Sequence, residues 1–325
     1  MSPDDTWSIG ELAERAGVTV KTVRFYSDGG LLPEAGRSGG GHRRYGPEAL
    51  DRLRLIRSLR ALDLPVPDVG RVLEREDLRD GVLEDVIADR LRELGSQMAA
   101  LRWREAALQL VQDCPAAERA DRLRLIGAVS APPSTAPMAA FWRGLLPPRL
   151  SAGLRSAIVE AAVPQPPADP TPAQVLAFAR LHALVAEVLP HVDACRPTAR
   201  RSDGAGRPDV LYSGLGEAYA LAADAVRARR VPQGGEALDA FVGAYAGARG
   251  VRDTGAFRRE LGVVLAGAAD PFLDRYWRLV GEVSGGSAGA AEPNMGDAHE
   301  WLRAALGDGV TVGTVQPSAG AGAAT

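Results

Sequence analysis

Apolar residues recur at helical spacing near the start of the chain. From Ile9 to Ala16 they fall at i, i+3, i+4 and i+7, which predicts one face of a short amphipathic helix. Ser8 and Glu11 stand three residues apart in the pattern of a capping box, and Gly17 follows as a stop signal. The sequence therefore predicts a short helix that begins after Ser8 and ends before Gly17.

A second short helix is predicted directly after the first. Thr19 can cap this helix, with Val20 and Val23 pointing inward and Lys21 and Arg24 pointing outward. Glycines 29 and 30 end the apolar pattern. Two short helices joined by a tight turn are typical of a helix-turn-helix.

The next segment has the pattern of a β-hairpin. Residues 31–33 and 42–45 are predicted to be extended, with a run of glycines at 39–41 between them. Pro47 and Pro67 each stand where a further amphipathic helix begins. We therefore expect residues 1–78 to form a winged helix-turn-helix domain with a small hairpin wing.

A heptad pattern of apolar residues extends over residues 79–112. The seam has spacings of four and three residues, interrupted at Glu105, and a helix over 81–112 would be about 48 Å long. One interpretation is a long helix packed on its own domain. We favour an antiparallel coiled coil between two subunits, because the winged helix-turn-helix domain offers no other symmetric apolar surface. The expected dimerisation residues are Ile87, Leu91, Leu94, Met98, Leu101 and Leu108.

The remainder of the chain predicts an all-helical domain over residues 113–310. No segment alternates convincingly between apolar and polar residues, so the fold class is mainly α. Residues 311–325 contain few large apolar side chains and are predicted to be disordered. The expected helices lie near 139–162, 173–194, 213–230, 236–248, 255–267, 271–283 and 297–307.

Charge is distributed unevenly along the chain. The formal net charge is −3, yet residues 15–60 contain ten basic and four acidic side chains, a net +6. Cys114 and Cys195 are the only cysteines and have no CxxC spacing, so we expect neither a metal site nor a cofactor. The first residues lack a signal-peptide pattern and no long apolar run occurs, which favours a cytoplasmic protein without a membrane span.

Four sequence blocks resemble the MerR family of transcription regulators. They are Trp7-Ser8-Ile9-Gly10-Glu11-Leu12-Ala13, Val23-Arg24-Phe25-Tyr26, Gly30-Leu31-Leu32 and Gly41-His42-Arg43-Arg44-Tyr45, in the family's order and spacing. Ser27 departs from the family, in which an acidic residue commonly follows the aromatic pair, and so do Asp63 and Pro65. The resemblance implies a homodimer that binds a pseudo-palindromic operator in double-stranded promoter DNA. It also implies that the dimer distorts an over-long promoter spacer and so controls RNA polymerase.

The candidate DNA contacts lie on the second helix and the wing. A helix in the major groove can place Lys21 or Arg24 against the O6 and N7 acceptors of guanine, while Thr19 caps that helix toward phosphate. The aromatic pair is open to a second interpretation, since Phe25 and Tyr26 can also be core residues. The expected set is Thr19, Lys21, Arg24, Tyr26, Arg43, Arg44 and Tyr45.

The function of the C-terminal domain is less clear from its sequence. Aromatic residues at helical spacing indicate core packing first and a drug or metabolite pocket second. The candidate effector contacts are Tyr245, Tyr276 and Trp277. An alternative is a regulator without an effector, whose C-terminal domain binds a protein partner or RNA polymerase. No motif of catalysis is present, so we do not expect an enzyme.

Overall fold

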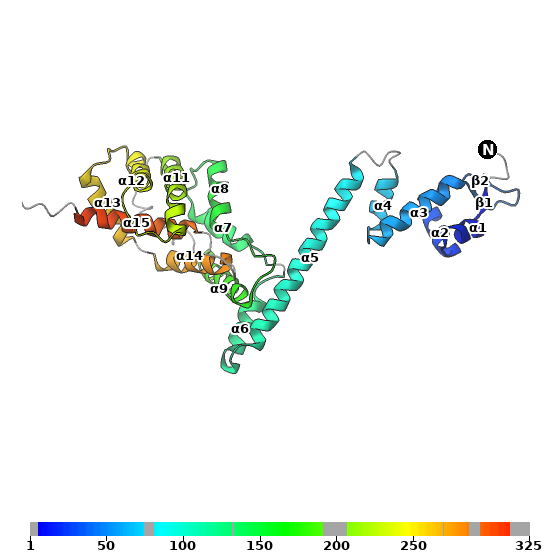
Figure 1. Ribbon diagram of the computed structural model, residues 1–325, viewed down its shortest axis with the longest axis horizontal. Helices are drawn as coiled ribbons and strands as arrows, with labels where there is room; N and C mark the ends of the chain where they lie inside the picture. The colour runs from blue at the N-terminus through cyan, green and yellow to red at the C-terminus, as the bar shows by residue number, and fades with distance from the viewer. Residues whose placement is uncertain are drawn as a thin grey trace, which may run out of the picture. The chain divides into compact units, whose positions relative to one another are not determined.

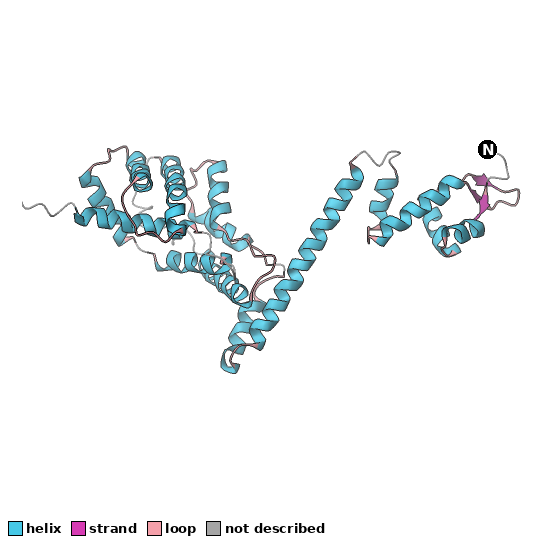
Figure 2. Ribbon diagram, in the orientation of Figure 1, coloured by secondary structure: helices cyan, strands magenta, loops and turns pink. Residues whose placement is uncertain are grey.

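The computed structural model describes residues 6–74, 81–131, 133–190, 207–268, 270–285 and 293–312, with side chains up to residue 307. The chain divides into two compact units, residues 1–96 and 97–325. Helices dominate both units, and strands occur only near the N-terminus of the described chain (Figures 1 and 2). The predicted mainly α fold with a small hairpin is confirmed.

The first two helices follow the local signals of the sequence. Helix α1 (Ile9–Ala16) begins with the predicted capping box, in which the Ser8 hydroxyl accepts from the Glu11 N–H and the Glu11 carboxylate accepts from the Ser8 N–H. Gly17 ends α1 with φ of 63°, a left-handed conformation that favours glycine. Helix α2 (Val20–Asp28) is capped by Thr19. The helix-turn-helix is therefore confirmed.

The wing belongs to a three-stranded antiparallel sheet. Strands β2 (Gly36–Arg37) and β3 (Arg43–Tyr45) form a hairpin, although its first strand lies at 36–37 and not at the predicted 31–33. Strand β1 (Trp7–Ser8) pairs with the other edge of β3. Two residues are too short to show an alternating pattern, so the sequence did not predict β1. Because Trp7 lies opposite Tyr45, the start of α1 is attached to the base of the wing.

Two further helices complete the core of the first unit. Helix α3 (Pro47–Ala61) buries Leu53 and Ile56, and α4 (Val66–Leu73) buries Val69, all without exposed surface. These side chains pack with Leu12 of α1 and Val23 of α2 in one hydrophobic cluster. Helix α2 is therefore held by its inner face, and its outer face is left for solvent.

Helix α5 (Val82–Gln112) contributes to both units. Val86 belongs to the core of the first unit, whereas Trp103, Ala106 and Leu110 belong to the core of the second. Trp103 meets Phe178 edge to face at a centroid distance of 5.3 Å. The end of this helix is therefore a structural part of the C-terminal unit.

The second unit is built from helices throughout its described residues. One predicted helix, 139–162, is in fact two helices, because Pro147 and Pro148 interrupt it and Arg155 donates to both of their carbonyl oxygens. The residues from 116 to 127, for which no helix was predicted, are helical. The elements are η2 (Ala116–Glu118), α6 (Arg119–Gly127), α7 (Ala136–Leu145), α8 (Ala152–Ala162), α9 (Pro172–Val188), α11 (Pro208–Arg227), α12 (Glu236–Arg249), α13 (Gly255–Gly267), α14 (Pro271–Ser284) and α15 (Met295–Val312).

Some predictions fall on residues that the structure does not describe. The helix predicted over 173–194 is observed as α9, and residues 191–194 lie outside the described part of the chain. Most of the predicted disordered tail, residues 313–325, lies outside it as well. Among the described residues, no helix combines the length and apolar character that a membrane crossing requires.

Candidate nucleic-acid interface and ligand cavity

The outer face of α2 carries two basic side chains. Lys21 and Arg24 are exposed, and neither has a hydrogen-bond or ion-pair partner among the residues described. Val23 on the opposite side is fully buried, which fixes the rotation of the helix about its axis. Val20, predicted to point inward, is instead 39% exposed. This surface can therefore donate hydrogen bonds to a ligand from both cations.

The aromatic pair at the end of α2 is divided between surface and interior. Phe25 is 59% exposed, whereas Tyr26 is partly buried, and their rings meet edge to face at 5.3 Å. A phenylalanine that packs in a core is usually buried, whereas Phe25 is exposed beside two cations. Phe25 is therefore a candidate contact that the expected set did not include.

Arg43 is held by acceptors from three positions in the first unit. Its guanidinium donates to Asp28 at 2.5 Å, contacts Glu34 at 2.6 Å and donates to the Ser27 hydroxyl at 3.0 Å. The hydrogen bond to Asp28 is the main cause that raises the pKa of Arg43 above its usual range. The family commonly has an acidic residue at the position of Ser27. Here the neighbouring Asp28 supplies the carboxylate instead.

Tyr45 and Arg44 lie on opposite sides of β3. Tyr45 is fully buried, and its hydroxyl donates to Ser27 at 2.9 Å, so its role in the interface is to hold the strand against α2. Arg44 is partly exposed and lies 3.8 Å from the carboxylate of Glu11. A backbone hydrogen bond from Ser8 is the main cause that lowers the pKa of Glu11, and the charge of Arg44 adds to it. Of the two arginines on β3, Arg44 is thus the freer one.

Several arginines of the basic segment stabilise the fold and are not free at the surface. They donate to carbonyl oxygens at helix and loop ends: Arg52 to Leu31 at 2.7 Å and Arg57 to Ala16 at 2.5 Å. The Arg15 guanidinium stacks over the Trp7 ring at 4.6 Å. The sequence count of +6 therefore overstates the charge that a polyanion could contact.

The six seam residues of α5 are all solvent-exposed in the single chain. Their exposed fractions range from 37% for Ile87 to 71% for Leu108. In the same helix Trp103 and Leu110 are buried in the second unit, so this end of α5 has one buried and one exposed apolar face. A row of exposed apolar side chains at heptad spacing is typical of an interface that needs a second helix.

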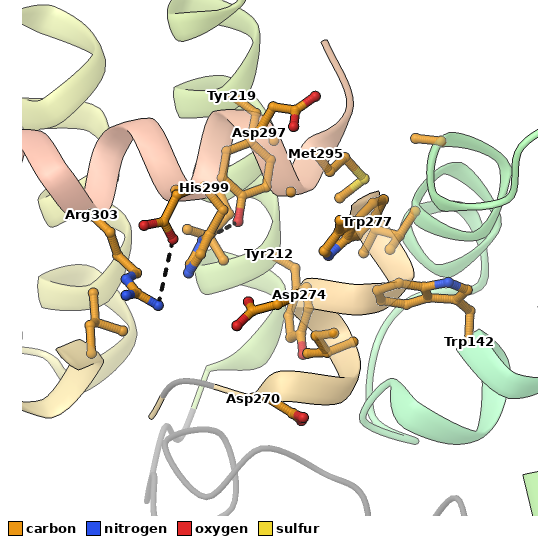
Figure 3. Close-up of a pocket in the computed structure, with 18 of the residues that line it drawn as sticks. Trp142, Tyr212, Tyr219, Asp270, Asp274, Trp277, Met295, Asp297, His299 and Arg303 are labelled. Carbon is orange, nitrogen blue, oxygen red and sulfur yellow. Dashed lines mark hydrogen bonds and ion pairs between the residues drawn. The ribbon is translucent and has the colours of Figure 1, made fainter. Parts of the chain in front are cut away.

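A cavity of about 1000 Å³ lies within the second unit (Figure 3). Its walls come from α7, α8 and every helix from α11 to α15. Tyr245 and Trp277, two of the candidate effector contacts, line the cavity. Tyr276 does not: it is fully buried and its hydroxyl donates to the Ala162 carbonyl at 2.8 Å. Burial raises the pKa of Tyr276.

Further aromatic and polar residues line this cavity without having been predicted. Trp142 and Trp277 approach at 5.3 Å with an angle of 46° between their planes. The Tyr219 hydroxyl and His299 Nδ1 share a hydrogen bond of 2.9 Å. No local spacing connects residues 142, 219, 277 and 299, so the sequence pattern carried no signal for their proximity.

The α1–α2 pair with its wing defines a winged helix-turn-helix protein, and the comparisons with known proteins agree. The family model "MerR HTH family regulatory protein" matches residues 7–76. An uncharacterised HTH-type transcriptional regulator of Pseudomonas aeruginosa is 36% identical over 118 residues, which are 35% of this chain and 89% of the relative. The chain therefore belongs to the MerR family of helix-turn-helix regulatory proteins.

Other relatives match about a third of the chain or less. The nodulation protein NolA of Bradyrhizobium elkanii is 44% identical over 68 residues, so that 21% of this chain spans 31% of NolA. A lead(II)-bound transcription regulator from Ralstonia metallidurans is 36% identical, covering 34% of this chain and 89% of that protein with a TM-score of 0.30. The chain thus spans about a third of the length of NolA, one of the curated relatives it matches.

Proposed function

We propose that this protein is a homodimeric DNA-binding transcription regulator whose C-terminal unit senses a small molecule. The observation that carries the proposal is the pair of unpartnered cations, Lys21 and Arg24, on the solvent face of α2 in a MerR-type domain. A helix that presents such residues can enter the major groove of double-stranded DNA and read guanine.

The interface residues have different tasks in this proposal. Lys21 and Arg24 read base edges, with Thr19 and Tyr26 directed to the phosphate backbone beside them. Arg44 binds phosphate from the wing. Arg43 and Tyr45 position β3 against α2, since their polar atoms are already occupied by Asp28, Glu34 and Ser27.

The exposed seam of α5 supports the homodimer. Two copies of the helix in antiparallel arrangement would bury the six apolar side chains against each other. A two-fold dimer presents two recognition helices, so its operator is a pseudo-palindrome. We infer that a rigid dimer bound between two promoter elements distorts the spacer and so controls RNA polymerase.

The cavity favours a small molecule over a protein partner as the signal. Its volume of about 1000 Å³ is in the range of pockets that enclose drug-sized ligands. Trp277 of its wall lies on α14, whose C-terminal end accepts two hydrogen bonds from Gln174 of α9 at 2.9 Å. Helix α9 in turn packs Phe178 on Trp103 of α5. A ligand that moves α14 thus has a packed route to the dimerisation helix.

Substitutions at Arg24 and Arg44 test the assignment of DNA contacts. Arg24→Ala should reduce the preference for the operator over mismatched duplexes by about tenfold, because it removes contacts to a base. Arg44→Ala should weaken binding to every duplex and lower the salt slope by about one. Fluorescence anisotropy over a salt series measures both quantities. Arg92→Ala, an exposed arginine on α5, is the control.

Equal and sequence-independent losses for Arg24→Ala and Arg44→Ala would contradict the role given to Arg24. Footprinting on the protein's own promoter then tests the distortion. Protection of an inverted repeat between the promoter elements, with enhanced cleavage at its centre, is expected. A footprint upstream of both elements would instead mean recruitment without distortion.

A further inference from the structure

The cavity of the second unit has an excess of negative charge. Five carboxylates line it, those of Asp270, Asp274, Glu282, Asp297 and Glu300. Two arginines, Arg278 and Arg303, line it as well. With a neutral His299 the lining side chains therefore carry a net charge of −3. Charge of one sign in a concave, partly apolar site attracts ligands of the other sign.

Three of the five carboxylates are already engaged within the protein. Asp270 accepts the Phe272 N–H at 2.9 Å, and Asp297 accepts the Asn294 N–H at 3.0 Å. Glu300 pairs with Arg303 at 3.7 Å. These groups shape the site and contribute charge, but their oxygens are partly occupied.

Asp274 and Glu282 are different, because neither has a hydrogen-bond or ion-pair partner among the residues that the structure describes. Both lie on α14, on either side of Trp277. In Figure 3 the Asp274 carboxylate projects from α14 toward the side of the cavity where His299 and Arg303 lie. A bound ligand can therefore meet an acceptor of full negative charge near this wall.

The opposite component of the site is aromatic. Trp142 and Trp277 form one wall, and three tyrosines, Tyr212, Tyr219 and Tyr245, lie on others. Aromatic faces attract flat apolar groups and, through their quadrupole, cations as well. Aromatic walls next to unpaired carboxylates thus fit a ligand that is aromatic and positively charged.

We propose that the cavity binds an organic cation with an aromatic body, held between the tryptophans with its charge toward Asp274. That this ligand is the signal for transcription rests on the proposed function, whereas its chemical class rests on the cavity alone. Arg278 opposes the binding of such a ligand, since its charge has the same sign. An anionic ligand would instead have to be held by the two arginines against the repulsion of five carboxylates.

The test titrates three probes of similar shape into the full-length protein without DNA. They are 9-aminoacridine, a flat aromatic cation, acridine, which is mostly neutral at slightly alkaline pH, and acridine-9-carboxylate, which is anionic. Isothermal titration calorimetry measures each dissociation constant. We expect 9-aminoacridine to bind at least about tenfold more tightly than acridine, and the carboxylate to bind most weakly.

Single substitutions in the wall then separate charge from shape. Asp274→Asn should weaken 9-aminoacridine binding about two- to fivefold, as expected for a partly exposed ion pair, and leave acridine unchanged. Arg278→Ala should strengthen it by a similar factor. Trp277→Ala should weaken both ligands about fivefold or more. Asp121→Asn, an exposed aspartate on α6, is the matched control and should change neither.

Thermal unfolding of each variant checks that the fold persists. Because Asp274 is exposed, Asp274→Asn tests the role of the charge even if Trp277→Ala unfolds the protein. Failure of 9-aminoacridine to bind, equal binding of all three probes, or preference for the carboxylate would overturn the proposed ligand class. Cation binding that depends on Asp274 but changes neither operator affinity nor the enhanced cleavage at the operator centre would support the ligand class and contradict the sensing role.

Discussion

The seam of α5 allows the strongest quantitative prediction about assembly. Leu94 and Leu101 are 38% and 60% exposed in the single chain. Replacing either by aspartate removes about 1 kcal/mol of apolar burial and adds about 1 kcal/mol or more for the desolvated carboxylate. Because a symmetric dimer contains each substitution twice, a single variant should lose about 4 kcal/mol, or roughly a thousandfold in the dimer dissociation constant.

Analytical ultracentrifugation measures the dimer dissociation constant directly. The double variant Leu94→Asp with Leu101→Asp should sediment as a monomer. It should bind the operator poorly, since one DNA-binding domain makes only half of the contacts to DNA. Val263→Asp is the matched control, because Val263 is 75% exposed on α13 but lies outside the seam. This variant should remain a dimer.

One outcome would refute the interpretation of the seam. If the double variant stays dimeric at the same concentrations as the parent protein, α5 is not the interface. Circular dichroism must show unchanged helix content in both variants, because a loss of helix would itself remove the seam. The interface would then be sought on the second unit.

Three further predictions test how individual side chains support the site. Tyr45→Phe removes the hydrogen bond to Ser27 and should lower the free energy of unfolding by about 1 kcal/mol in chemical denaturation. Its DNA binding should weaken as well, because the hydrogen bond holds the wing against α2. The pKa of Tyr276 is raised in the folded state, so the neutral phenol stabilises the fold below pH about 10 and this contribution is lost as pH rises further. Tyr276→Phe should therefore reduce the loss of stability that denaturant titration detects under alkaline conditions. In Gly296→Ala the new methyl group would clash with the Trp277 side chain, so this variant should bind 9-aminoacridine less tightly than the parent. Unchanged affinity would mean that the tryptophan wall is not used.

Much of the first unit could be predicted from the sequence because its signals are local. The capping box at Ser8, the left-handed Gly17 and the apolar face of α1 each depend on residues within one or two helical turns. The heptad spacing of α5 is local in the same sense. Such patterns determine where a helix begins, where it ends and which face is apolar.

The partners of those faces were decided by tertiary structure. Arg43 and Tyr45 share a pattern with Arg44, yet the fold places Asp28, Glu34 and Ser27 around the first two and leaves Arg44 near the surface. Spacing along a strand shows which side chains alternate, but it does not show which polar groups a distant turn brings to them.

The same limit explains α5 and the cavity. Periodicity identified the six apolar residues of the seam, but it did not identify Trp103, whose packing on Phe178 belongs to a second apolar face of α5 that is buried within the chain. The cavity joins residues from 142 to 303, and no pattern within one helix encodes a space between several. The sequence by itself thus determined most of the helices, the DNA-binding class and the apolar spacing of α5, while tertiary packing alone decided which side chains remain free to bind.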